Sequence, residues 1–159
     1  MVAAYLGLGS NLGDRAANLW EATRRLGELR GCTVERSSRL YETAPVGSQE
    51  QAWFLNAVLR VETALSPHDL LRAAKRIEQE MGRVPGERWG PRLIDIDVLL
   101  FGEKRIASAE LTVPHPELWR RRFVLVPLAD VVPSGPLADE VRQRLEELGE
   151  QQELRPWPT

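Results

Sequence analysis

The sequence has little cysteine, no long apolar run and almost no net charge. Cys32 is the one cysteine among 159 residues, so the chain cannot form an internal disulfide, and we expect a reducing cytoplasm as its location. No apolar run approaches the roughly 20 residues that span a bilayer, and residues 1–5 lack the features of a secretory signal. The net charge is −2, which gives no global positive field. We therefore expect neither a membrane nor a nucleic acid as partner.

Length and composition are those of an ordinary globular domain. With 43% hydrophobic and 28% charged residues, the chain indicates neither disorder nor a fibrous repeat. A chain of 159 residues can bury about two-thirds of the surface of its unfolded form. We expect one domain over residues 1–159, acting as a monomer.

Hydrophobic periodicity and turn residues predict the order of helices and strands. Ser66, Pro67 and Asp69 have the spacing of a helix start, and Asp14 can cap an earlier helix. The predicted strands cover 2–9, 32–42, 53–61 and 93–101, with an extended segment at 111–116; the predicted helices cover 14–31, 66–82, 123–131 (broken near Pro127) and 137–148, before a loose tail at 155–159. Because strands and helices do not alternate strictly, we expect an α+β fold, a ferredoxin-like α/β sandwich with a mainly antiparallel central sheet and helices on both faces.

Two aspartates interrupt the apolar strand 93–101. Asp95 and Asp97 are separated by one residue, which places both carboxylates on one face, about 6.6 Å apart at the backbone. A pair of solvated acids is one interpretation. Two carboxylates in an apolar run are costly without compensation, however, and Mg²⁺ typically takes one or two carboxylates together with phosphate oxygens of a substrate. We favour a magnesium site.

An arginine-bearing loop comes directly before this strand. Residues 83–92 contain two prolines and two glycines, so they cannot form regular structure. Arg83, Arg88 and Arg92 could close over a polyphosphate and neutralise its charge, although a solvated loop is the simpler interpretation for each arginine alone.

The strand at 53–61 carries an aromatic ring and an amide on one face. Phe54 could stack on a flat heterocycle while Asn56 bonds to its edge. Core packing explains Phe54 equally well, but a buried Asn56 needs a partner. Trp89 and Phe123 are further stacking candidates with the same core alternative.

The remaining polar motifs have simpler interpretations. The glycine-rich segment 7–13 matches neither common phosphate-loop pattern and is interpreted as a turn. His115, between two prolines, could contact phosphate or ribose or be structural. His68 lacks a companion ligand for zinc, and Cys32 is expected to be a buried thiol.

The run from Arg88 to Leu99, RWGPRLIDIDVL, closely resembles the signature of the 6-hydroxymethyl-7,8-dihydropterin pyrophosphokinase family of folate biosynthesis. Five shorter segments resemble the same family in the same order: Gly9–Leu12, Thr43–Gly47, Phe54–Ala57, Arg76–Glu78 and Leu111–His115. The resemblance implies transfer of pyrophosphate from ATP, as co-substrate, to a hydroxymethyl dihydropterin, with release of AMP.

The resemblance also implies roles for individual residues. It assigns catalysis to Arg83, Arg92, Asp95 and Asp97, the two aspartates holding two Mg²⁺ ions. It assigns ATP binding to Leu71, Lys75, Glu78, Arg88, Trp89, Arg92, Val98, Thr112, His115 and Arg121. It assigns pterin binding to Thr43, Pro45, Val46, Phe54, Asn56, Trp89, Asp95 and Phe123, with the pterin stacked between the two phenylalanines.

Three positions depart from the family pattern. Pro85 stands where a second arginine is familiar, Pro116 replaces an aromatic residue, and Glu110 stands where a basic residue helps to bind nucleotide. Two other functions stay open at this point: a magnesium-dependent nucleotidyl- or glycosyltransferase that uses the Asp-x-Asp strand, and a nucleotide-binding module without catalysis.

Overall fold

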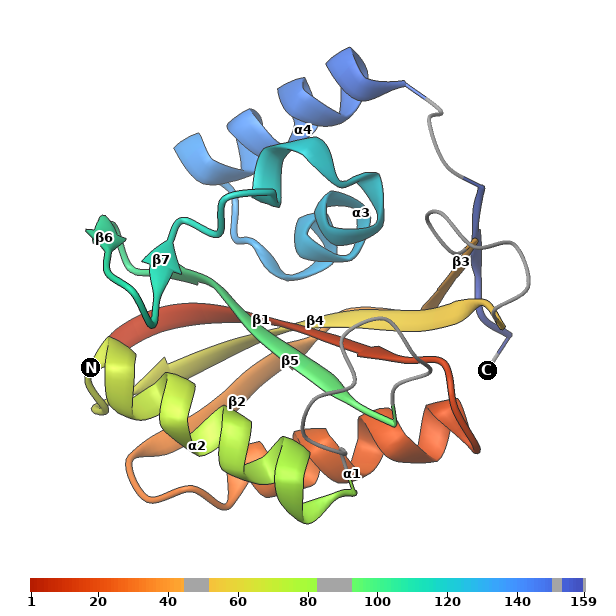
Figure 1. Cartoon of the computed structure of the whole chain (residues 1–159). Coiled ribbons are helices and arrows are strands. Elements are labelled where there is room, and N and C mark those ends of the chain that lie inside the picture. The colour runs from red at the N-terminus through yellow and green to blue at the C-terminus, as the bar shows by residue number, and fades with distance from the viewer. Residues whose placement is uncertain (45–51, 83–92, 150–152, 159) are drawn as a thin grey trace.

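The computed structural model describes residues 1–44, 52–82, 93–149 and 153–158. The strands are β1 (Val2–Ser10), β2 (Cys32–Ser37), β3 (Tyr41–Thr43), β4 (Phe54–Thr63), β5 (Asp95–Phe101), β6 (Ile106–Ala107), β7 (Thr112–Val113) and β8 (Leu154–Pro156); the helices are α1 (Arg15–Gly27), α2 (Pro67–Glu80), α3 (Arg122–Val131) and α4 (Pro136–Leu148), with a short 3₁₀ turn, η1 (Leu118–Arg120). Figure 1 shows α1 and α2 on one face of the sheet and α3 and α4 on the other. The predicted α+β sandwich is confirmed. Within the described ranges, no helix is long and apolar enough to cross a membrane.

The main sheet is antiparallel at every described pairing. Its order is β5-β1-β4-β3-β8, and β2 also pairs with β4. The long strand β4 serves two partners on one side, because residues 54–56 pair with β3 and residues 59–63 pair with β2. Strands β6 and β7 form a separate small ribbon. As a result, β5 lies at one edge of the main sheet and β8 at the other.

Each face of the sheet packs into its own apolar cluster. The cluster toward α1 and α2 contains buried residues of strands and helices, among them Leu6, Leu8, Leu55, Ile96, Leu19, Leu26, Leu70 and Ile77. The cluster toward α3 and α4 contains Tyr5, Val58, Leu99, Leu125, Leu128, Val131 and Val141. Because side chains alternate across a strand, these apolar residues decide which face the polar residues between them occupy.

The predicted helix starts are confirmed. The Asp14 carboxylate accepts a hydrogen bond from the Ala17 N–H at 3.1 Å, and the Ser66 hydroxyl accepts one from the Asp69 N–H at 3.1 Å. Side-chain acceptors at these positions satisfy backbone donors that have no partner inside the helix.

Three predicted elements differ from the structure. The strand expected at 32–42 is divided into β2 and β3, because the Ser38 hydroxyl accepts the Val58 N–H at 2.9 Å where the two strands meet β4. The helix expected to break near Pro127 is continuous as α3. Pro127 is buried in the packed face of this helix, and the apolar contact offsets the backbone hydrogen bond that a proline cannot donate. The tail expected to be loose forms β8, which pairs with β3.

Candidate active site

Asp95 and Asp97 begin the edge strand β5 and lie on its face toward α3 and α4. Ile96 and Val98 point to the opposite face, where both are buried with α1 and α2. The two aspartates are only partly buried. Both carboxylates therefore lie on one face that solvent can reach, as alternation along the strand predicts.

A row of three residues crosses the sheet from β4 through β1 to β5. Gly9 pairs with Asn56 on one side and with Asp95 on the other. Residues paired across antiparallel strands point to the same face. With strands about 4.8 Å apart, Asn56 and Asp95 are separated by roughly 10 Å at the backbone. The turn predicted for this glycine-rich segment begins later than expected, because β1 continues to Ser10.

The absence of a side chain at Gly9 leaves room for the Asn56 amide. A Cβ at this position would lie 3.0 Å from Asn56 Oδ1 and 3.6 Å from a ring carbon of Phe54. Sequence reasoning missed this contact. Its one local signal is a glycine inside an alternating strand, which often marks a close approach of other groups.

Asn56 is held in place by Thr43 on the neighbouring strand β3. The Asn56 Nδ2 group donates to the Thr43 hydroxyl oxygen at 2.7 Å, and both residues are buried. Thr43 is paired with the half-buried Phe54 in the strand register. The partner that a buried amide requires is therefore supplied by the segment in which pterin contacts were predicted.

Phe123 lies in the first turn of α3, the helix that covers this same face of the sheet. It is half-buried, and the Arg121 guanidinium lies 5.6 Å from the centre of its ring. The two predicted stacking residues, Phe54 and Phe123, thus come from the sheet and from its covering helix.

His115 lies against β5 and senses the charge of Asp97. Its backbone N–H donates to the carbonyl of Leu99 at 2.9 Å. Leu99 is the extra residue of a β-bulge, because Leu100 and Val98 pair with Tyr5 and Leu6, which are consecutive on β1. A bulge of this kind redirects the backbone locally. His115 Nδ1 accepts the backbone N–H of Glu117 at 3.2 Å, so a neutral ring carries its proton on Nε2 and can donate there.

Charged groups from three elements surround His115. Burial lowers the pKa of His115; Asp97 and Glu117 raise it, whereas the positive charges of Arg121 and Lys75 lower it. The net effect is a lowered pKa, which favours the neutral ring. The structure therefore brings together an imidazole, two carboxylates and two cations at the edge of β5, a combination suited to a phosphorylated ligand and a metal ion.

Glu78 connects α2 to the strand that carries the aspartates. Its side chain is 1% exposed; one carboxylate oxygen accepts the Ile96 N–H at 2.7 Å, and the other lies 3.3 Å from the Lys75 ammonium. Because Ile96 lies between Asp95 and Asp97, this buried carboxylate fixes the start of β5. Glu78 is predicted to bind ATP, and the described contacts give it a positioning role as well.

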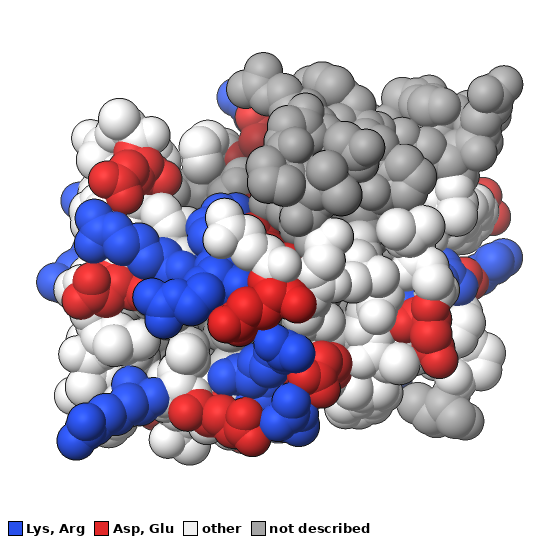
Figure 2. Space-filling model, turned by 60° about the horizontal axis from the view of Figure 1, so that its bottom comes forward, with Lys and Arg blue, Asp and Glu red and all other residues white. Residues whose placement is uncertain are grey.

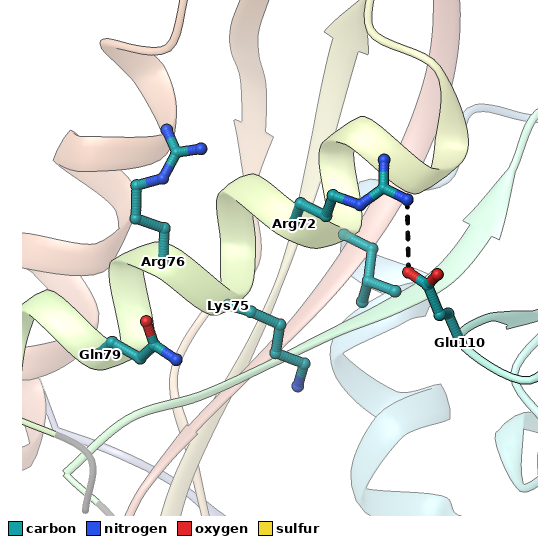
Figure 3. Close-up of a pocket in the computed structure, with 6 residues that line it drawn as sticks. Arg72, Lys75, Arg76, Gln79 and Glu110 are labelled. Carbon is teal, nitrogen blue, oxygen red and sulfur yellow. Dashed lines mark ion pairs between the residues drawn. The ribbon is translucent and has the colours of Figure 1, made fainter. Parts of the chain in front are cut away.

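A pocket of about 440 Å³ lies along α2 next to Glu110. Figure 3 shows Arg72 reaching across to Glu110, and their charged groups are 3.5 Å apart. In the same view, Lys75 and Arg76 point to different sides of the helix. Arg72 therefore offsets the acidic residue that departs from the family pattern. The pocket is lined by Leu71, Arg72, Lys75, Arg76, Gln79 and Glu110.

A second hollow, also of about 440 Å³, lies between α1 and α2. Two of the arginines that line it are ion-paired: Arg25 lies 2.6 Å from Glu21 and 3.3 Å from Glu80, and Arg24 lies 2.7 Å from Glu28. Figure 2 shows positive and negative side chains interspersed over this face of the molecule. Because the charges around this hollow are mixed rather than of one sign, we place the candidate site at the β5 edge and not here.

The other predicted residues fall into two groups. Among those described, Leu71 lines the pocket along α2, Val98 is buried, and Thr112 is exposed on β7. The predicted residues outside the described part of the chain are Pro45, Val46, Arg83, Arg88, Trp89 and Arg92. Across residues 1–44, 52–82, 93–149 and 153–158, no cluster of three or more His, Cys, Asp or Glu residues could hold a metal ion. The aspartates of β5 are a pair.

Cys32 and His68 are not among the predicted site residues. Cys32 is buried, and burial raises the pKa of its thiol. His68 Nε2 lies 3.2 Å from the Ser108 hydroxyl. The buried thiol predicted from the sequence is confirmed.

Comparisons with known proteins agree with the resemblance. A model of the family described as 7,8-dihydro-6-hydroxymethylpterin-pyrophosphokinase matches residues 5–133. The 2-amino-4-hydroxy-6-hydroxymethyldihydropteridine pyrophosphokinase of Bacillus subtilis is 46% identical over 128 residues, covering 80% of this chain and 77% of the relative. The enzyme of the same name from Methylorubrum extorquens is 46% identical over 149 residues, covering 93% and 94%.

Longer relatives and solved structures match over part of their length. The mitochondrial folate synthesis bifunctional protein of Arabidopsis thaliana is 49% identical over 130 residues, which are 82% of this chain and 23% of that protein. The wild-type Plasmodium falciparum HPPK-DHPS structure has a TM-score of 0.67 at 18% identity, over 95% of this chain and 44% of that one. At this identity the match supports the fold alone.

These matches decide between the functions that the sequence left open. The two relatives that match this chain over most of their own length are both pyrophosphokinases. The comparisons therefore support neither another transferase nor a module without catalysis. The chain is an enzyme that transfers pyrophosphate to 6-hydroxymethyl-7,8-dihydropterin in folate biosynthesis. It belongs to the 7,8-dihydro-6-hydroxymethylpterin-pyrophosphokinase family.

Proposed function

We propose that the pyrophosphate donor is ATP and that the reaction takes place over the row formed by Asn56, Gly9 and Asp95. The pterin hydroxymethyl oxygen would attack the β-phosphorus, the bond from that phosphorus to the α-phosphate oxygen would break, and AMP would leave. The hydroxyl proton would pass to solvent water in the same step. The observation that carries this proposal is the row itself, because it sets a buried amide about 10 Å from a partly exposed carboxylate on the sheet face toward α3 and α4.

The pterin would bind at the β4 end of this row. Phe54 and Phe123 would stack on the two faces of the ring, and the Asn56 amide would bond to its polar edge. The hydrogen bond from Asn56 to Thr43 supports this placement, because it fixes the orientation of the amide before the ligand arrives. Pro45, Val46 and Trp89 are proposed to complete the pterin contacts.

ATP would bind at the β5 end and extend toward α2. The Nε2–H group of His115 and the charges of Lys75 and Arg121 would contact the phosphates. The further residues proposed to bind ATP are Leu71, Glu78, Arg88, Trp89, Arg92, Val98 and Thr112. Arg83 and Arg92 are proposed to offset the negative charge that develops on the transferred group.

The residues of β5 fit two magnesium ions. Asp95 and Asp97 are partly exposed, share one face and provide the oxygen ligands that Mg²⁺ prefers, leaving other positions to water and phosphate oxygens. Bound there, the ions would neutralise phosphate charge and orient the β-phosphorus.

We also propose that the protein acts as a monomer in the cytoplasm. Cys32, the one cysteine of the sequence, is buried and cannot form an internal disulfide, which supports a reducing compartment. Light scattering at working concentration and fractionation of the source cells would test these two statements.

The roles of the aspartates are tested by Asp97→Ala, with Asp139→Ala as the matched control. Asp139 is an exposed carboxylate on α4 that pairs with Arg142 at 3.0 Å. Pterin-dependent release of AMP should fall at least about a thousandfold in Asp97→Ala, a loss of ~4 kcal/mol of transition-state stabilisation, and stay unchanged in Asp139→Ala. Retention of near-normal turnover by Asp97→Ala would contradict the assignment of the metal ligands.

A further inference from the structure

The C-terminal strand β8 lies against the part of the sheet that leads into the candidate pterin site, yet it falls outside residues 5–133 that match the family. In the register, Glu42 pairs with Arg155 and Thr43 pairs with Leu154. Two more backbone hydrogen bonds extend the contact beyond the strand ends, from the Ala44 N–H to the Glu153 carbonyl at 3.0 Å and from the Trp157 N–H to the Leu40 carbonyl at 2.9 Å. Figure 1 shows β8 beside β3 at the edge away from β5.

Two arginines from opposite ends of the chain share the Glu42 carboxylate. Arg15, at the start of α1, lies 2.7 Å from one oxygen, and Arg155, on β8, lies 2.9 Å from the other. The Glu42 side chain is 11% exposed, so each oxygen of a largely buried anion has a cationic donor. Arg15 also donates to the Trp53 carbonyl at 2.8 Å, which ties the residue before Phe54 to the same network.

The same two arginines pack on two tryptophans. The Arg155 guanidinium lies 4.3 Å from the ring centre of Trp53, and the Arg15 guanidinium lies 4.9 Å from that of Trp157. Each arginine therefore joins the C-terminal tail to the strands that begin the candidate pterin site. Planar guanidinium groups suit this combination of stacking and carboxylate pairing better than an ammonium does.

The network reaches the candidate site through the backbone. Glu42 and Thr43 are neighbours on β3 and point to opposite faces, so the arginines hold the strand from one face while Thr43 holds Asn56 on the other. Trp53 precedes Phe54 directly, so stacking on Trp53 restrains the start of β4 in the same way.

We propose that Arg155 and Glu42 are positioning residues for pterin binding: β8, through this pair, fixes Thr43 and Phe54 so that the Asn56 amide and the aromatic ring are preorganised. This inference rests on the proposed pterin site. It gives a role to β8, which lies outside the family match, through the contacts of β8 with β3. It also links the C-terminal tail to the pterin rather than to ATP.

Kinetics of Arg155→Ala in the full-length protein test the proposal, with Arg142→Ala as control. Each variant removes an exposed arginine side chain that forms an ion pair with a carboxylate. Arg142, however, lies on α4 and pairs with Asp139. We expect the KM for the pterin to rise about fivefold in Arg155→Ala, the effect of ~1 kcal/mol, while kcat and the KM for ATP stay within twofold. Arg142→Ala should match the wild type, and Arg155→Lys, which keeps the charge, should recover part of the pterin affinity.

Hydrogen exchange without ligand supplies a second readout. In Arg155→Ala, backbone amides of residues 41–44 and 54–56 should exchange faster, whereas those of α2 and β5 should not change. An unchanged pterin KM, or an equal rise in both KM values with faster exchange throughout, would overturn the proposal. Failure of the proposed function is distinguishable, because the wild type itself would then lack pterin-dependent release of AMP, and the exchange pattern of Arg155→Ala would still test the positioning.

Discussion

At the scale of single residues, the candidate site depends on polar side chains placed between apolar ones. Asp95 and Asp97 lie partly exposed on the sheet face toward α3 and α4 because Ile96 and Val98 are buried on the other face. Asn56 shares that face because Leu55 and Ala57 are buried with α1 and α2. The apolar residues thus fix the direction of the polar ones, and a shift of either strand by one residue would turn them into the core.

Gly9 is the residue between the two halves of the site. We predict that Gly9→Ala raises the KM for the pterin about tenfold, ~1.4 kcal/mol, with little change in the KM for ATP, because the new Cβ would lie 3.0 Å from Asn56 Oδ1 and displace the amide. Steady-state kinetics with each substrate varied in turn would measure both values.

Gly7→Ala is the matched control for this substitution. It makes the same change in the same strand, so the effects on the unfolded chain are alike. A Cβ at Gly7 would meet the Leu99 side chain at 3.5 Å, an ordinary van der Waals distance. The KM for the pterin should therefore stay near the wild-type value, and an equal rise in both variants would show that the Asn56 contact is not the cause.

At the scale of secondary-structure elements, local patterns predicted what depends on local chemistry. The caps at Asp14 and Ser66 were predictable because a side-chain acceptor and a backbone donor a few residues later decide them. The alternation of Asp95 and Asp97 on β5 is equally local.

The pairing of β8 with β3 was not predictable in this way. The residues that hold it, Arg15, Glu42 and Arg155, are separated by 27 and 113 positions in the sequence, and no periodicity links them. The contact between Gly9 and Asn56 depends on register between β1 and β4, which the sequence alone did not supply. The predicted residues in 45–51 and 83–92 lie outside the described structure, so their roles stay predictions.

The two ion pairs of Glu42, with Arg15 on α1 and with Arg155 on β8, should depend on pH. Burial raises the pKa of Glu42, but hydrogen bonds from Arg15 and Arg155 lower it by more, so the net pKa in the folded protein is below the ordinary 4.5. A carboxyl group with a lowered folded pKa stabilises the fold above its unfolded pKa, and this contribution is lost as pH falls through the folded value.

We therefore predict that Glu42→Gln lowers the free energy of unfolding by about 1–2 kcal/mol at neutral pH, and that the difference from the wild type shrinks as pH falls below 4.5. Urea unfolding at several pH values would measure it. In an Arg155→Ala background the pH-dependent part should be smaller, since one of the two donors is gone. A difference that stays constant with pH would contradict the ionic origin of the effect.

At the scale of the whole molecule, the elements that support the site come from both faces of the sheet and from its far edge. Helix α2 fixes β5 from one side through Glu78, α3 brings Phe123 over the other, and β8 fixes β3 at the far edge. The two proposed substrates would meet over β1, whose glycines leave that part of the sheet without bulky side chains. This arrangement accounts for a reaction that relies on positioning and charge neutralisation.

The central claim is that pyrophosphate moves as one unit from ATP to the pterin alcohol. The most direct test is the identity of both products when the purified protein is mixed with ATP, magnesium and 6-hydroxymethyl-7,8-dihydropterin. We predict AMP and the pterin diphosphate in equal amounts, identified by chromatography and mass spectrometry. Formation of ADP with a pterin monophosphate would contradict attack at the β-phosphorus and the function proposed here.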